Sequence, residues 1–270
     1  MTLHIPAPIE ERATEVPRPT AAESAAIAVR RVSTTYEEVG SRLGVYLVNP
    51  NVVLTLADER GSADLPVQAS AKELRRFVAR ANDVLLPEGC RIVIHAGPHR
   101  PSFLRGQADL EIVSLAGLAQ VSARTTLPGI SPFDAKSSWD GLREWCTQTR
   151  ASVIAAQQAG KLPAHVDPVH FEIGLALGYP DRAMLGYLPV ADDAWDEDKC
   201  VDARIPFSDR YDCAQPIYSF LKTDEADPAI VEHQRRWGQV LARFYGSSWH
   251  ERLHRDPDFL RARRQTDRNG

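Results

Sequence analysis

Three amphipathic segments, separated by short β-rich runs, limit this chain to a fold that combines helices with a sheet. Residues 70–86 and 139–159 carry apolar side chains at the three- and four-residue spacing of a helix. Residues 228–245 repeat that spacing with side chains that we expect to face inward, Ile230, Trp237, Leu241 and Phe244. Such helices need an apolar surface to cover, and a sheet provides one. We therefore expect an α/β or α+β protein with a small mixed sheet and helices packed on it.

Short runs rich in β-branched and aromatic residues supply the strands of that sheet. Residues 90–95 and 109–118 contain two such runs, and residues 216–223 contain another. Within residues 42–61, two β-rich runs flank the turn residues Asn49-Pro50-Asn51. This arrangement predicts a hairpin, or a strand with a sharp corner.

Domain organisation follows from the distribution of prolines and aromatic residues. Residues 1–25 contain four prolines and no aromatic residue, so we expect a disordered, flexible tail there. Their order of charged and apolar residues is typical neither of a secretory signal nor of a transit peptide. We expect residues 26–270 to form a single globular domain, with residues 247–270 as a C-terminal helical extension.

Composition narrows the class of protein. The formal net charge of -4 gives no overall positive field for gripping nucleic acid. No uncharged apolar run approaches the roughly 20 residues of a membrane span. The four cysteines show neither a CxxC spacing nor a dense framework, which is typical of a reducing cytoplasm. Arginine outnumbers lysine and alanine is abundant, a bias typical of GC-rich bacterial genomes. We therefore expect a bacterial cytoplasmic protein that binds neither nucleic acid nor membrane.

The stretch from Asp167 to Leu188 allows two interpretations. Its apolar residues alternate as in a strand over residues 169–177, yet Asp167-Pro168 is a good helix start and Gly178 a good helix stop. We favour the helix. In that case Gly178 takes a positive φ, Pro180 prevents the helix from continuing, and residues 181–185 begin a second short helix.

The motifs of this stretch are His170, Glu172-Ile173-Gly174, Leu177-Gly178-Tyr179-Pro180 and Gly186-Tyr187-Leu188. With them, residues 90–246 resemble an uncharacterised bacterial family, a domain of unknown function with the pattern His-Glu-Ile-Gly, Leu-Gly-Tyr-Pro, Gly-Phe-Ile. The chain departs from that pattern at Phe171, which separates the histidine from the glutamate, and in a longer segment at residues 196–215. The resemblance implies a fold and no reaction.

Two groups of polar residues are candidates for a ligand site. His95, His99 and Arg100 belong to a strand and the Gly-Pro loop that follows it, where they form either an anion site or a polar surface loop. Gly97-Pro98 prevents the helix that a metal site with this histidine spacing would need. Tyr179 is either a ligand contact or a partly buried anchor.

Three further residues are candidates for catalysis. His170 and Glu172 can act as a base and its orienting carboxylate, or pair with neighbours in a first helical turn. Cys213, with Arg210 near it in sequence, is a possible thiolate nucleophile. A zinc site from Cys200, Cys213 and His170 lacks a tight ligand pair, so we predict no metal site.

Together these residues favour an enzyme that acts on a small polar or anionic metabolite by an unknown reaction, with the 95–100 loop facing the His170 region. The alternative is a non-catalytic ligand-binding or assembly module. The sequence leaves open whether a cofactor is bound and what the oligomeric state is. A single pocket that gathers the candidates would favour the enzyme.

Overall fold

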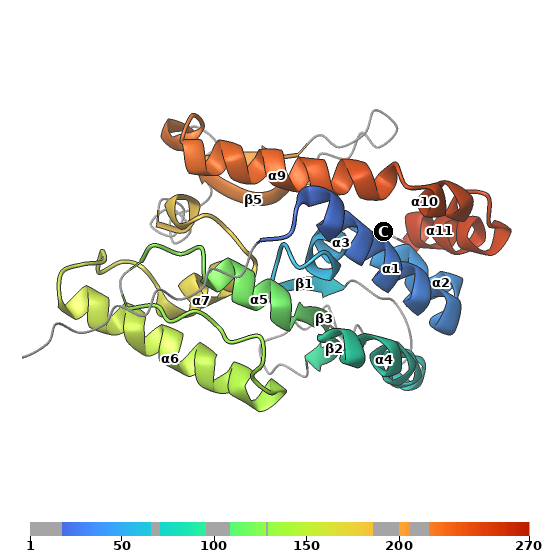
Figure 1. Cartoon of the computed structure of the whole chain (residues 1–270), viewed down its shortest axis with the longest axis horizontal. Coiled ribbons are helices and arrows are strands. Elements are labelled where there is room, and N and C mark those ends of the chain that lie inside the picture. Colours follow the sequence, from blue (N-terminus) through green and yellow to red (C-terminus); the bar gives the residue numbers. More distant parts are fainter. Residues whose placement is uncertain are drawn as a thin grey trace, which may run out of the picture.

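The computed structural model describes residues 18–65, 71–95, 109–127, 129–185, 200–205 and 216–269. Helices dominate these residues and the strands are short (Figure 1). The strands are β1 (Ser62–Leu65), β2 (Cys90–His95), β3 (Asp109–Ser114), β4 (Cys200–Arg204) and β5 (Pro216–Leu221). The longer helices are α1 (Ala21–Val39), α4 (Ala71–Leu85), α5 (Leu115–Ser122), α6 (Trp139–Gln158), α7 (Pro168–Ala176), α9 (Pro228–Tyr245) and α11 (Pro257–Asn269). The shorter ones are α2 (Ser41–Leu47), α3 (Pro50–Leu56) and α10 (Ser248–Leu253), with single 3-10 turns at η1 (Leu86–Glu88) and η3 (Lys222–Asp224). The predicted combination of helices and sheet is confirmed.

The central sheet has three strands in the order β1-β3-β2, and both of its pairings are antiparallel. Ile112 of β3 lies opposite Ala63 of β1 and Ile92 of β2, so apolar side chains align across the sheet. β4 and β5 form a second antiparallel pair. Because both described sheets are antiparallel, the α+β alternative describes the fold.

The two faces of the central sheet contact two different apolar cores, because alternate residues of a strand point to opposite faces. Leu110 and Ile112 of β3 belong to the larger core, which α1, α3, α4 and α9 also line. Val113 of β3 belongs to the smaller core, which α5, α6 and α7 complete. The sheet therefore joins the two cores.

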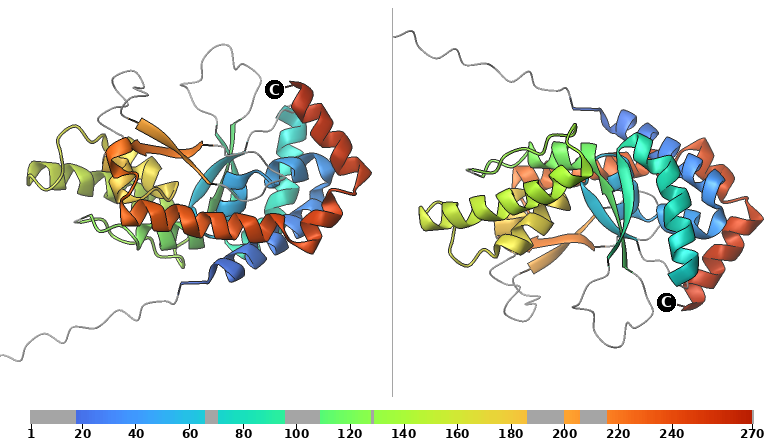
Figure 2. Two further views of the ribbon diagram at one scale, coloured as in Figure 1. Left: turned by 90° about the horizontal axis from the view of Figure 1, so that it is seen from above. Right: turned by 90° about the horizontal axis from the view of Figure 1, so that it is seen from below.

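Helix α9 lies across α1 and α3 (Figure 1). Its apolar side chains face inward as predicted, and Trp237, Leu241 and Phe244 are fully buried. The chain then continues into α10 and α11, which pack against α1 and α2 at one end of the molecule (Figure 2). There the ring of Tyr36 contacts those of Trp249 and Phe259 edge-on. The C-terminal helices are thereby fixed to the N-terminal ones.

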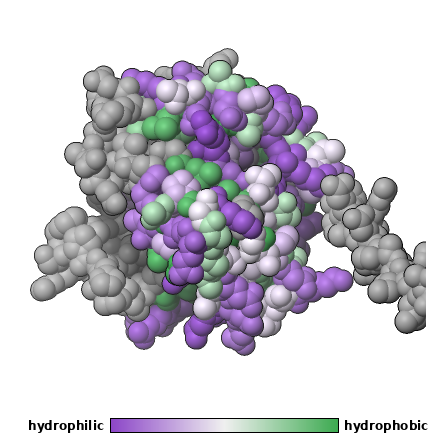
Figure 3. All heavy atoms as spheres, turned by 90° about the vertical axis from the view of Figure 1, so that its left-hand side faces the viewer, coloured by the Kyte–Doolittle hydropathy of each residue, from purple (hydrophilic) through white to green (hydrophobic). Residues whose placement is uncertain are grey.

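The opposite end of the molecule is formed by α6 and α7 (Figure 1). Three apolar side chains of these helices, Ile154, Val169 and Ile173, are exposed. Figure 3 shows apolar residues interspersed with hydrophilic ones on this face. Single exposed apolar side chains of this kind are normal for a protein surface.

Both alternatives predicted around Asn49-Pro50-Asn51, the hairpin and the strand with a sharp corner, are wrong, because both flanking runs are helical, as α2 and α3. Asn49 caps α3, and its side-chain oxygen accepts the Asn51 N–H at 3.0 Å. Pro50 occupies the first helical turn, where its missing N–H costs nothing. Val52 and Val53 are fully buried. Tertiary burial therefore outweighs the β-propensity of these residues.

The boundary of the predicted N-terminal tail also needs correction. Helix α1 begins at Ala21, and Thr20 and Glu23 form a capping box at its start. Ala21 and Ala25 are buried, so the last residues of the predicted tail belong to the packed structure. Residues 1–17 lie outside the described residues.

The helical interpretation of the stretch after Asp167 is confirmed. Asp167 caps α7, and its carboxylate accepts the N–H groups of Val169 and His170 at 2.7 and 2.9 Å. Gly178 has the expected positive φ, at 77°, and residues 181–185 are helical again. The Gly178 turn packs closely on its surroundings, since a Cβ there would meet Val121 Cγ1 at 3.0 Å and the Glu59 carbonyl oxygen at 3.2 Å.

We predict that Gly178→Ala lowers the free energy of unfolding, measured by urea denaturation, by more than about 1 kcal/mol, because it combines left-handed strain with crowding. Gly160→Ala is the matched control. Gly160 has a φ of 67°, yet apart from its neighbours in the chain no atom lies within 4 Å of the position of its Cβ. It should show the strain alone. Equal losses in the two variants would show that close packing at Gly178 contributes nothing.

Candidate functional site

The predicted catalytic pair makes two separate sets of contacts. His170 is exposed, and its Nδ1 lies 3.9 Å from Asp167 Oδ1. Glu172 is buried and accepts a hydrogen bond from Arg150 Nε on α6. These contacts match the alternative in which each residue pairs with its own neighbours.

Several other predicted site residues lie outside the described part of the chain. His95 ends β2, and its backbone pairs with Asp109. The side chain of His95 is not described, nor are His99, Arg100, Arg210 and Cys213. Cys200 is buried in β4. Within the described residues, no three His, Cys, Asp or Glu side chains are grouped as metal ligands.

The structure reveals a charged segment that sequence reasoning missed, at residues 58–61 between α3 and β1. Asp58, Glu59 and Arg60 are all buried. Asp58 has a positive φ of 60°, which is rare for a residue other than glycine, and its carboxylate accepts hydrogen bonds from Arg31 and Ser114. The sequence does contain a signal of this segment, because three consecutive charged residues follow closely after an apolar run.

Glu59 is the centre of a group of side chains from four parts of the chain, which we call the Glu59 cluster: Arg18, Ser24, Glu59, Arg124 and Arg236. Ser24 of α1 donates its hydroxyl to Oε1 at 2.8 Å. Arg236 of α9 donates to both carboxylate oxygens, with its Nε 2.8 Å from Oε2. Nη2 of Arg124, just after α5, lies 3.3 Å from Oε2, and Nη2 of Arg18 lies 3.4 Å from it. The cluster therefore joins α1, α5 and α9 to the segment after α3 (Figure 1).

The cluster carries an excess of positive charge. Burial by itself would raise the pKa of Glu59, but the hydrogen bond from Arg236 and the charges of Arg124 and Arg236 outweigh it and lower that pKa. Burial lowers the pKa of Arg124 to about 10, so this side chain remains charged at neutral pH. Three guanidinium groups thus surround a single carboxylate.

Arg124 also has hydrogen-bond donors that no described residue accepts. Its Nη2 donates to Glu59 and to Gln120, but its Nε and Nη1 are buried without a partner. Buried donors normally have an acceptor, and leaving them unpaired costs free energy. Two donor atoms of this charged side chain are therefore left to pair with an acceptor outside the described residues.

A second polar network lies beside the Glu59 cluster, around His233 of α9. Its Nε2 lies 2.8 Å from the carbonyl oxygen of Gly178 and therefore donates to it, which leaves Nδ1 to accept from the hydroxyl of Tyr218 at 3.2 Å. The ring of Tyr218 packs on that of Tyr179 at 5.3 Å. The guanidinium of Arg60 lies over the rings of Tyr179 and Trp237. Tyr179 is therefore a partly buried anchor, one of the two roles predicted for it.

Burial shifts the pKa of three further described side chains, His233 beside the Glu59 cluster and two cysteines elsewhere in the fold. Burial lowers the pKa of His233 to about 3, so its imidazole is neutral and a weak base at neutral pH. Burial raises the pKa of the Cys90 and Cys146 thiols to about 12, which keeps both from forming the reactive thiolate. The arginines, by contrast, are charged and converge on one point.

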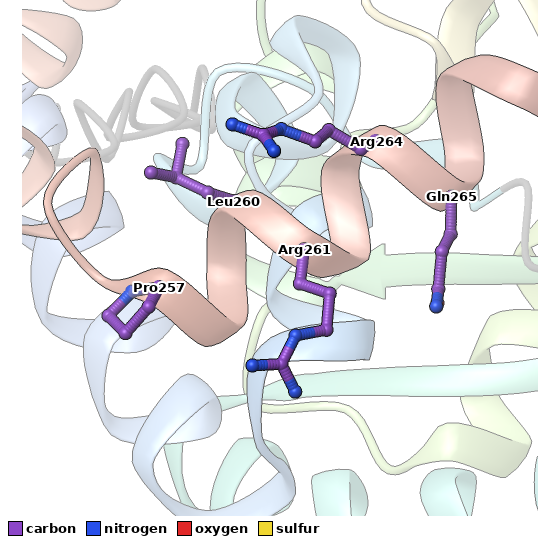
Figure 4. Close-up of a pocket in the computed structure, with 5 residues that line it drawn as sticks. All are labelled: Pro257, Leu260, Arg261, Arg264 and Gln265. Atoms are coloured by element: carbon purple, nitrogen blue, oxygen red, sulfur yellow. The ribbon is translucent and has the colours of Figure 1, made fainter.

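A surface groove of about 480 Å³ lies along α11 (Figure 4). It is lined by Pro257, Leu260, Arg261, Arg264 and Gln265, all from that one helix. Figure 4 shows these side chains projecting in different directions. Binding sites usually have polar groups that converge on one point. The polar groups of the Glu59 cluster, by contrast, converge on one carboxylate.

Comparisons with family models, with curated proteins and with solved structures find no match to this chain. The resemblance to a domain of unknown function therefore stays a prediction. Within the described residues, no helix has the length and apolar character needed to cross a bilayer.

The pKa of His233 predicts a pH dependence of stability. Its folded pKa of about 3 lies below the ordinary value of 6.5, so its contribution to stability is complete above pH 6.5 and is lost as the pH falls toward 3. We expect the free energy of unfolding of the wild type to fall more steeply between pH 6.5 and about 4 than that of His233→Gln. His250 is also shifted, but it is common to both proteins and cancels in the difference. Parallel pH profiles of the two proteins would contradict the lowered pKa of His233.

Proposed function

We propose that this chain binds a small anionic molecule at the Glu59 cluster. Three features support the proposal: the excess of positive charge, its convergence on one carboxylate, and the exposure of part of the cluster to solvent. Guanidinium groups pair with carboxylates and phosphates through charge-assisted hydrogen bonds, which are the stronger kind. A polar, anionic ligand is also what the sequence predicts.

The single observation that carries the proposal is that Arg124 has both uncompensated charge and unpaired donor atoms. Its charge is only partly compensated by Glu59, which Arg236 and Arg18 share, and its Nε and Nη1 donors lack acceptors among the described residues. A purely structural ion pair would be expected to satisfy its buried donors. An anion would accept these hydrogen bonds and neutralise the charge.

Binding without catalysis accounts for the described side chains better than an enzyme does. Glu172 is occupied by Arg150, and His233 is a weak base. An enzyme that uses His95, His99, Arg100, Arg210 or Cys213 stays a prediction, because those side chains lie outside the described residues.

We predict that small anions raise the melting temperature by several degrees at constant ionic strength, because a ligand of the folded state stabilises it by mass action. The measurement is thermal denaturation of the full chain in acetate, sulfate or phosphate. Arg124→Gln should remove the rise. Arg235→Gln is the matched control, since Arg235 is an exposed arginine of α9 that pairs with Glu232 on the same helix. An equal rise in Arg124→Gln would contradict the proposal.

A further inference from the structure

We infer that the anion is a compact dianion of the phosphoryl class, either inorganic phosphate or a phosphate monoester, held by Arg18, Arg124 and Arg236. The inference rests on the proposed function and adds to it the charge and shape of the ligand. It follows from the charge balance of the cluster, from the position of its guanidinium groups, and from the side on which the cluster meets solvent.

The charge balance favours two negative charges on the ligand. Three guanidinium groups and the Glu59 carboxylate leave two positive charges without a partner inside the cluster. Glu232 also acts on Arg18, but it is exposed and pairs with Arg235. Arginines this close repel one another, and Arg18 and Arg236 contribute to lowering the pKa of Arg124. A dianion would cancel the excess, whereas a monoanion would leave half of it.

The position of the guanidinium groups favours a compact ligand. Arg18, Arg124 and Arg236 all reach the same atom, Oε2 of Glu59, at 3.4, 3.3 and 2.8 Å. The positive charge is therefore concentrated at one point and is not spread along a groove. A phosphoryl group concentrates its charge on oxygens of one phosphorus atom. That point is held by Glu59, so the ligand would bind beside its carboxylate, where the two charges of an extended dicarboxylate lie too far apart to face all three guanidinium groups.

The unpaired donors favour a group with several acceptor oxygens. Nε of a guanidinium carries one N–H bond and Nη1 carries two, so three of the five N–H bonds of Arg124 lack an acceptor. A monoester phosphoryl group offers three strong acceptor oxygens, one more than a carboxylate. Phosphate therefore matches these donors better.

The exposure of the side chains indicates where the ligand enters. The side chain of Glu59 is 0% exposed and that of Arg236 is 12% exposed, whereas those of Arg18 and Arg124 are 42% and 26% exposed. The cluster is thus closed at Glu59 and open at Arg18 and Arg124. A small anion can reach the exposed part of both arginines from solvent, and it pairs with the buried Nε and Nη1 of Arg124 once that side chain turns toward it.

The test compares methyl phosphate with dimethyl phosphate by isothermal titration of the full chain at pH 8 and constant ionic strength. A monoester has a second pKa of about 6 and is a dianion at this pH, whereas the diester is a monoanion of similar shape. We expect methyl phosphate to bind about tenfold or more tightly than dimethyl phosphate, acetate or succinate. Inorganic phosphate is titrated alongside. Whichever of the two dianions binds more tightly identifies the ligand as free phosphate or as an ester.

Two variants locate the site. Arg18→Gln removes one positive charge at the most exposed arginine of the cluster, so the protein should fold normally and bind methyl phosphate about tenfold more weakly. Arg235→Gln should bind it as the wild type does. Equal effects of these two variants would place the binding elsewhere and overturn the inference.

The outcomes separate this inference from the proposed function. If acetate and dimethyl phosphate bind as tightly as methyl phosphate, and Arg124→Gln weakens all of them, the chain binds anions but does not select a dianion. If succinate binds most tightly, the ligand is a dicarboxylate and the inference is wrong. If no anion binds, both the inference and the proposed function are wrong.

Discussion

The carboxylate of Glu59 is the interaction on which much of the structure depends. It is fully buried, and a buried charge is costly unless it is paired and hydrogen-bonded. Its partners include Ser24 of α1, Arg124 just after α5, and Arg236 of α9. A single ionised side chain thus joins segments that are far apart in sequence. Removing Glu59 would leave the guanidinium groups of Arg124 and Arg236, both mostly buried, without their shared carboxylate.

The backbone around Glu59 connects the cluster to the rest of the fold. The Gly61 N–H donates to the carbonyl of Ala176, and the Ser114 N–H donates to the carbonyl of Gly61, so residues 58–61 join the end of α7 to β3. Gly178, two residues after the end of α7, packs on the Glu59 carbonyl. The carbonyl of Gly178 in turn accepts a hydrogen bond from His233. The same short segment therefore positions the arginines and the aromatic network beside them.

Local patterns in the sequence predict most of the helices and strands, but not the site. The spacing of apolar residues predicts α4, α6 and α9, and the Asp167-Pro168 and Gly178 signals predict the ends of α7. The α2 and α3 helices are missed because burial of Val52 and Val53 depends on tertiary packing. Helix α1 is not predicted either, and the strand predicted over residues 109–118 ends at Ser114, where α5 begins. The Glu59 cluster is missed because its members are up to 218 positions apart in sequence, from Arg18 to Arg236. Only the fold brings them together.

The most direct test of this account is a double-mutant cycle between Glu59 and Arg236. The free energy of unfolding in urea would be measured for the wild type, Glu59→Gln, Arg236→Gln and the double variant. If the buried carboxylate joins α9 to the segment after α3, the two residues should show a coupling energy of about 1.5–3 kcal/mol. Additive losses, with a coupling energy near zero, would show that the fold does not depend on this interaction.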